Sequence, residues 1–156
     1  MKTLIVYYSR TGITKKAAER VALEVGADLE EIKDLSDRRG ALGYLKSGRD
    51  AMKNKLASIA VPQKNPAYYD LVVVCTPTWA YNMACAVRSY LTQEKDKIKK
   101  IAFLATHGSD GGERAVRKMA VLSGLEPIAT LIMTSRELVQ EISLEKISAF
   151  TNELRK

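Results

Sequence analysis

Short apolar runs alternate along the chain with longer segments whose apolar residues recur at helical spacing. Runs of about four to eight residues rich in β-branched and aromatic side chains are typical of strands. Five strands are therefore predicted, over residues 3–8, 27–33, 68–75, 100–106 and 126–133. The run YYDLVVVC at 68–75 is the most apolar, and its consecutive valines are typical of a parallel strand covered on both faces. The segment 27–33 is more polar, which predicts a place nearer an edge of the sheet.

Helices are predicted between and after the strands, over residues 15–25, 42–52, 83–91, 113–122 and 144–154. The first of them has apolar residues on one face and lysines on the other, and Gly26 ends it. The second falls in the least regular third of the chain, residues 34–66, and a break at Gly48 is an open alternative. Ser143 is placed to cap the last helix.

The order of these elements predicts the fold class. Strands separated by helices of about 10–15 residues indicate βαβ units and a parallel sheet, and right-handed crossovers place helices on both faces. We therefore expect an α/β protein with three layers and a five-stranded parallel sheet. The 156 residues, 46% hydrophobic and 28% charged, suit a single domain over 1–156. Separate cofactor and substrate lobes are not expected.

Neither a membrane segment nor a secretory signal is expected. The longest apolar run near the middle of the chain, Leu71–Cys75, is far shorter than the roughly 20 residues that a membrane helix needs. The apolar part of MKTLIVYYSR is short for a signal peptide. Cys75 and Cys85 are too few for a disulfide scaffold and, with one histidine, for a zinc site. We expect both cysteines to pack in the interior of a cytoplasmic protein without a metal.

Three turn-rich segments each follow a predicted strand: SRTGIT at 9–14, TPTWAYN at 76–82 and HGSDGG at 107–112. In an open parallel sheet, the loops that follow the strands lie at one edge, and such folds bind their ligands there. We therefore expect one ligand site, built from these three segments.

The segment 9–14 has the chemistry of a phosphate site. Ser9, Thr11 and Thr14 supply hydroxyls. Gly12 allows close backbone approach, and the helix start that follows offers unpaired amides with a partial positive charge. An ordinary Ser/Thr N-cap is the alternative. Other phosphate motifs are missing: the sequence has no G-x-x-x-x-G-K-[ST], no G-x-G-x-x-G after the first strand, and no arginine six residues after either cysteine.

Residues 5–21, IVYYSRTGITKKAAERV, resemble the phosphate-loop signature of the flavodoxin family, and CTPTWAYN and THGSDGG resemble its two flavin-binding loops. The similarity covers nearly the whole chain and implies a flavodoxin-like fold that binds flavin mononucleotide (FMN) non-covalently. The first loop would wrap the phosphate with Ser9, Arg10, Thr11, Gly12, Ile13 and Thr14. The second would line the isoalloxazine with Thr76, Pro77, Thr78, Trp79, Ala80, Tyr81 and Asn82. The third would line its pyrimidine edge with Thr106, His107, Gly108, Gly111 and Gly112.

Aromatic residues in the second loop are the candidate walls for the flat flavin ring. The alternative for Trp79 is a core residue, and for Tyr81 simple surface packing. His107, the only histidine, could donate to the flavin or to a substrate carbonyl, or could have no chemical role. No residue is nominated as catalytic.

The charge departs from that of the family's electron carriers, which are typically acidic. Lysine and arginine total 25 against 18 acidic residues, a formal net charge of +7. Residues 31–64 hold eight cations against four anions, and residues 94–100 hold four against two. A solvated face, a docking surface for an acidic partner and a channel for an anionic substrate are the alternatives. Nucleic acid is not an expected partner, because the cations lack interleaved aromatic residues and any known motif.

The leading hypothesis is an FMN-binding carrier that exchanges electrons with redox partner proteins. The alternative is a small flavin-dependent NAD(P)H:quinone-type oxidoreductase. The carrier is favoured because no second domain is expected to bind a nicotinamide, although the flavin face itself could stack one. The oligomeric state stays open.

Overall fold

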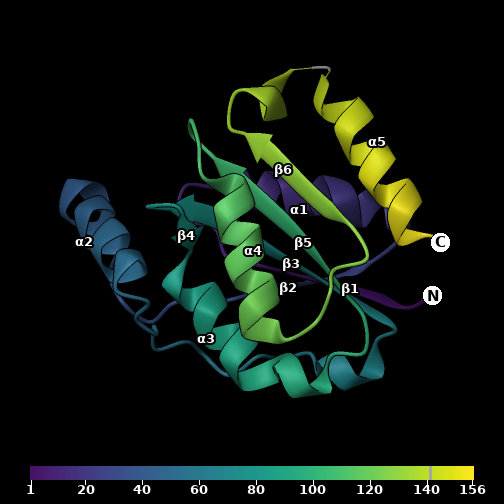
Figure 1. Cartoon of the computed structure of the whole chain (residues 1–156), viewed down its shortest axis with the longest axis horizontal. Helices are drawn as coiled ribbons and strands as arrows, with labels where there is room; N and C mark the ends of the chain where they lie inside the picture. Colours follow the sequence, from purple (N-terminus) through teal and green to yellow (C-terminus); the bar gives the residue numbers. More distant parts are fainter. Residues whose placement is uncertain (141) are drawn as a thin grey trace.

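A parallel sheet of five strands forms the centre of the computed structural model, which describes residues 1–140 and 142–156 (Figure 1). The strand order is β2-β1-β3-β5-β6. The bounds are β1 Thr3–Tyr7, β2 Asp28–Glu31, β3 Leu71–Trp79, β5 Ile101–His107 and β6 Thr130–Thr134. Each neighbouring pair in this order is parallel. The predicted α/β class and the predicted sheet are confirmed.

Helices cover both faces of the sheet and complete three layers. They are α1 Ile13–Val25, α2 Gly40–Met52, α3 Cys85–Glu94, α4 Gly112–Ser123 and α5 Ile142–Leu154, with short 3-10 helices at Pro66–Tyr68, Lys95–Lys97 and Glu137–Val139. α1 and α5 share a core with one face of the sheet, and α3 and α4 share a core with the other. α2 lies beside the second face, at the periphery of the molecule in Figure 1. In the described part of the chain, no helix is both long enough and apolar enough to cross a membrane.

Alternate side chains of β3 enter the two cores. Val72 and Val74 pack with α3 and α4, whereas Leu71, Val73 and Cys75 pack with α1 and α5. All five side chains are fully buried, as the valine run predicts for a central parallel strand. β2, the more polar strand, pairs only with β1 and forms an edge of the sheet, also as predicted.

The segment 76–82 is not a simple loop. β3 continues past Cys75 to Trp79, and the chain then turns back into the two-residue strand β4 (Asn82–Met83), which pairs antiparallel with the end of β3. At the turn, Ala80 and Tyr81 have φ angles of 48° and 60°. Positive φ at both central residues is what the tightest hairpin turns require. Neither residue is the glycine or asparagine that usually signals such a turn.

Other element boundaries also differ from the prediction: β3 begins at Leu71 rather than Tyr68, and α3 covers Cys85–Glu94 rather than residues 83–91. β6 begins at Thr130 rather than Glu126, and Pro127, inside the predicted strand, has no amide to donate to a neighbouring strand. α2 begins at Gly40 and continues without a break through Gly48. Its start is therefore earlier than the apolar pattern indicated.

Ser143 does not cap α5, because it lies inside that helix. Its hydroxyl donates to the carbonyl oxygen of Gln140 at 2.7 Å and accepts a hydrogen bond from Arg20 of α1 at 2.9 Å. Ser143 therefore helps to tie α5 to α1.

Candidate functional site

The loops after β1, β3 and β5 meet at the carboxyl edge of the sheet. The hydroxyl oxygens of Thr14, at the start of α1, and Thr106, in β5, are 2.8 Å apart and buried. Gly111 lies against the β3–β4 hairpin: a Cβ added to it would be 2.7 Å from Tyr81 Cδ1 and 3.3 Å from Thr78 Cγ2. The predicted grouping of these three segments at one edge is confirmed.

The first loop leads into a helix start that carries no side-chain cap. Gly12 is the N-cap residue of α1, with a left-handed φ of 92°. Its amide donates to Ser9 Oγ at 3.0 Å. Within residues 1–140 and 142–156, the amides of Ile13, Thr14 and Lys15 have no hydrogen-bond acceptor. The chain does not form the ordinary Ser/Thr cap, and these amides fit an anionic ligand.

Burial divides the predicted site residues into two groups. The exposed or half-buried ones are Ser9, Arg10, Thr11, Gly12, Ile13, Pro77, Thr78, Ala80, Tyr81, His107 and Gly108. The buried ones are Thr14, Thr76, Trp79, Asn82, Thr106, Gly111 and Gly112. The first group can meet a ligand with side chain or backbone, whereas the second shapes the floor of the site. Contact of either group with a flavin stays a prediction.

The two aromatic residues of the hairpin have different environments. Trp79 is 8% exposed, and its ring meets Tyr8 edge-on, with 5.4 Å between the ring centroids. Tyr81 is 49% exposed, and the guanidinium of Arg114 lies 5.5 Å from its ring centroid. Tyr81 is therefore the more accessible wall for a flat ligand, and Trp79 packs mainly as part of the core.

The side chains of Asn82 and Thr76 form hydrogen bonds that hold the hairpin in place. Asn82 Nδ2 donates to the carbonyl oxygen of Ala51 at 2.7 Å and to Asn54 Oδ1 at 2.9 Å, which attaches the hairpin to the end of α2. Thr76 Oγ1 accepts the amide of Ala84 at 3.0 Å. These hydrogen bonds hold the hairpin, and contact of the two residues with a flavin stays a prediction.

Two buried polar atoms near this edge have no partner in the described chain: Nδ1 of His107 and Oγ1 of Thr78. A buried polar atom without a hydrogen bond costs about 1–3 kcal/mol. The ring of His107 also packs on the backbone of Gly112, where an added Cβ would be 3.0 Å from His107 Cδ2. The two atoms fit a polar ligand that brings the missing partners.

Two cavities open on either side of the meeting point. One, of about 300 Å³, is lined by Tyr81, His107, Ile132 and residues 110–114. The other, of about 460 Å³, is lined by residues 8–10 and 31–39. The site is therefore recessed beside both the first and the third loop.

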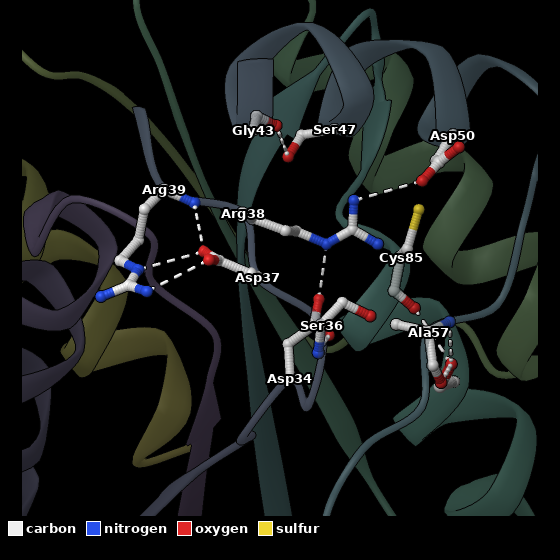
Figure 2. Close-up of polar contacts among 11 residues, drawn as sticks. Asp34, Ser36, Asp37, Arg38, Arg39, Gly43, Ser47, Asp50, Ala57 and Cys85 are labelled. Atoms are coloured by element: carbon white, nitrogen blue, oxygen red, sulfur yellow. Dashed lines mark hydrogen bonds and ion pairs between the residues drawn. The ribbon is translucent and has the colours of Figure 1, made fainter. Parts of the chain in front are cut away.

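An ion cluster beneath α2 was missed by the sequence patterns. Arg38 belongs to the basic segment 31–64 but is only 5% exposed. Its Nε donates to Asp34 Oδ2 at 2.6 Å and its Nη1 donates to Asp50 Oδ2 at 3.3 Å (contacts drawn in Figure 2). Burial alone lowers the pKa of Arg38, but the hydrogen bond and charge of Asp34 outweigh it and raise the pKa above its ordinary value. The guanidinium also lies 5.5 Å from the ring centroid of Trp79. Arg38 is thus a structural cation, and the sequence carried no signal for it, because a four-residue spacing brings side chains together on a helix, whereas Asp34 and Arg38 lie outside any helix.

Both cysteines are buried and free. Burial raises the pKa of the Cys75 thiol and of the Cys85 thiol. Since the thiolate is the reactive form, both are inert at neutral pH, in agreement with packing roles. No group of three or more potential metal ligands occurs among the described residues.

Comparisons with known proteins agree with the geometry. The family model described as flavodoxin matches residues 2–152. No curated protein matches significantly. A flavoprotein from Lactobacillus acidophilus NCFM, solved in complex with FMN, is 26% identical with a TM-score of 0.74, over 88% of this chain and 95% of that one.

Two further solved structures share the fold at lower identity. A flavodoxin, WrbA-like protein from Agrobacterium tumefaciens is 17% identical with a TM-score of 0.67, over 99% of this chain and 97% of that one. Oxidised Flavodoxin 2 from Bacillus cereus is 16% identical with a TM-score of 0.63, over 99% of this chain and 98% of that one. Since the family model spans almost the whole sequence, the chain belongs to the flavodoxin family.

Proposed function

We propose that this chain binds FMN at the carboxyl edge of the sheet and carries electrons between redox proteins. The observation that carries the proposal is the start of α1, where three consecutive amides have no acceptor in the described part of the chain. Membership of the flavodoxin family and the FMN complex of the similar Lactobacillus protein support the same cofactor.

The residues at this edge suit the separate parts of FMN. The amides of residues 13–15 and the hydroxyls of Ser9 and Thr11 suit the phosphate. The unpartnered atoms of His107 and Thr78 suit polar atoms of the flavin ring, and the exposed ring of Tyr81 offers a flat wall. Bound FMN supplies reversible uptake of electrons, while the protein orients it and limits the access of water.

Titration calorimetry of the cofactor-free protein with FMN and with riboflavin tests the binding site. A charged hydrogen-bond acceptor at the helix start is worth about 1.5–3 kcal/mol for each bond. We therefore expect FMN to bind at least about a hundredfold more tightly than riboflavin, which lacks the phosphate. Equal affinities would show that the start of α1 does not hold a phosphate.

The consumption of NADH and NADPH by the FMN-loaded protein, with and without a quinone, tests the carrier role. A carrier is expected to oxidise nicotinamides no faster than free FMN does, and adding quinone should change nothing. Rapid quinone-dependent turnover would instead identify a small NAD(P)H:quinone-type oxidoreductase.

A further inference from the structure

The outward side of α2 carries an apolar stripe. Leu42, Leu45 and Met52 follow the i, i+3, i+10 spacing that places side chains on one helix face. All three are at least 67% exposed. Single exposed leucines are ordinary, but a cluster of them on one helix marks an interaction surface.

Cations adjoin this stripe, and the exposed carboxylate that precedes α2, Asp37, pairs with Arg39. Lys46, Arg49 and Lys53 of the α2 segment are exposed. The sole carboxylate of residues 40–56 is Asp50, which is buried and pairs with Arg38 and with Lys55. We call these three apolar and three cationic side chains together the α2 face: Leu42, Leu45, Lys46, Arg49, Met52 and Lys53.

The helix α2 adjoins the candidate FMN site through residues outside the α2 face. Arg10 of the first loop lies over the ring of Tyr44, 5.4 Å from its centroid. Asn82 of the hairpin donates to Ala51 at the end of α2. A protein that docks on the α2 face would therefore be separated from the first and second loops by about the width of one helix, roughly 10–12 Å.

α2 is also held firmly, as a docking surface needs to be. Its inner side packs closely enough that a Cβ on Gly43 would overlap the backbone of Arg38. Arg38 reaches from there to Asp50, about two helical turns along α2 (Figure 2). The outer side chains are thus presented on a fixed helix.

We infer that the α2 face is the docking surface for a small acidic electron-transfer protein, an inference that rests on the proposed carrier function. The cations would meet its carboxylates, and the apolar stripe would meet an apolar patch among them. Charge argues against a second copy of the chain, because two such faces would bring like charges together. Leucines and cations on one helix also suit an anionic membrane surface, so binding to anionic vesicles is the measurement that separates the two occupants.

Binding of two acidic probes, a [2Fe–2S] ferredoxin and a [4Fe–4S] ferredoxin, tests the inference. Affinity is measured with FMN-loaded and with FMN-free protein at about 0.02 M and about 0.2 M salt. Lys46→Gln/Lys53→Gln should weaken binding roughly three- to tenfold at low salt and less at high salt. The matched control is Lys99→Gln/Lys100→Gln, which removes the same charge from exposed positions before β5, at the opposite edge of the sheet.

The apolar part has its own pair of variants. Leu45→Ser/Met52→Ser should weaken binding roughly tenfold or more. Leu23→Ser/Val121→Ser changes two still more exposed side chains on α1 and α4 and should leave binding unchanged. Since the replaced side chains are exposed, unfolding free energies should stay within about 0.5 kcal/mol of the parent.

Several results would overturn the inference. The first is that the parent protein binds neither ferredoxin. The second is that the α2 variants and the control variants weaken ferredoxin binding equally. The third is that the α2 variants lose only self-association, or only binding to phosphatidylglycerol vesicles. The carrier function can fail separately: if the protein binds ferredoxin but does not take up FMN, the proposed carrier function is wrong. If the protein takes up FMN but does not bind ferredoxin, only the docking inference is wrong.

Discussion

The second and third loops pack closely together because Gly111 has no side chain. Its φ is 92°, and an added Cβ would come within 2.7 Å of the Tyr81 ring and 3.1 Å of Tyr81 Cα. Gly111→Ala should therefore lower the free energy of unfolding by about 1–3 kcal/mol, through backbone strain and displacement of the hairpin. Gly108→Ala, in the same loop, has open space and no positive φ and should change it by less than about 0.5 kcal/mol. Urea denaturation measures the free energy of unfolding of both variants, and equal effects would contradict the close packing of Gly111 against Tyr81.

Thr14 and Thr106 form a buried hydroxyl pair between the first and third loops. Thr14→Val or Thr106→Val leaves the other hydroxyl buried without this partner, so each should destabilise the fold by about 1–3 kcal/mol. The double variant should lower the free energy of unfolding by less than the sum of the two single variants, because neither hydroxyl is then left buried without a partner. Chemical denaturation of the four proteins measures the coupling. Strict additivity would show that the two hydroxyls do not act together.

Arg38 and Arg39 are adjacent in the chain but have opposite surroundings, which makes them a matched test of how α2 is anchored. Arg38→Met leaves the buried Asp34 without its cation and leaves Asp50 with Lys55, which should cost about 3–5 kcal/mol of stability. Arg39→Met removes only an exposed pair with Asp37 and should cost at most about 1 kcal/mol. Urea denaturation measures both, and the fluorescence of Trp79, the only tryptophan, should change in the first variant alone. Equal costs would show that the cluster does not hold α2.

Glu137 fastens the turn between β6 and α5. Its carboxylate accepts hydrogen bonds from Lys146 Nζ at 2.6 Å and from the amide of Thr134 at 2.7 Å. The bond from Lys146 and then that from Thr134 lower the pKa of Glu137 to about 2. Because this folded value lies below the unfolded value of about 4.3, the stabilisation is complete above about pH 4.3 and is lost as the pH falls towards 2.

Glu137→Gln should therefore be less stable than the parent at pH 7, and the difference should shrink as the pH falls from about 4.3 towards 2. Thermal unfolding across that range measures it. Glu126→Gln, at an exposed position in the preceding loop, should match the parent throughout. A difference for Glu137→Gln that stayed constant with pH would show that its ionisation is not involved.

The elements that could be predicted from sequence are those whose signal is local. The valine run of β3 and the apolar face of α1 carry their own periodicity, and the alternation of such strands and helices predicts a parallel sheet. β4 carries none, since its two residues become a strand only by pairing with Thr78 and Trp79. The same limit applies to the site. The first loop was recognisable from its hydroxyls and glycine, whereas no local pattern separates the buried Arg38 from the exposed Arg39.

At the scale of the whole molecule, the positive charge is not uniform around the candidate site. Arg10 lies over Tyr44 on one side, and Arg114 lies over Tyr81 on the other. Lys99 and Lys100 precede β5 and so lie at the opposite edge of the sheet. Surface charges separated by more than about 8–10 Å are largely screened at moderate salt. Of the net charge of +7, the cations beside the site should therefore influence a bound cofactor most.

Arg114 gives this expectation a direction. Reduction adds negative charge to bound FMN at neutral pH, so a nearby cation favours the reduced form and raises the midpoint potential. Arg114→Gln should therefore lower the two-electron potential by about 10–30 mV at low salt, since about 1.4 kcal/mol corresponds to about 30 mV for two electrons.

Arg117→Gln removes the same charge from an exposed position one turn further along α4 and should have a smaller effect. Spectroelectrochemistry of both variants at about 0.01 M and about 1 M salt decides, because the Debye length falls from about 30 Å to about 3 Å between them. The difference between the variants should shrink at high salt to the extent that the Arg114 charge is exposed to solvent. Equal shifts in the two variants, or none in either, would place Arg114 and the Tyr81 ring away from the flavin and would leave the +7 charge to act through partner association alone.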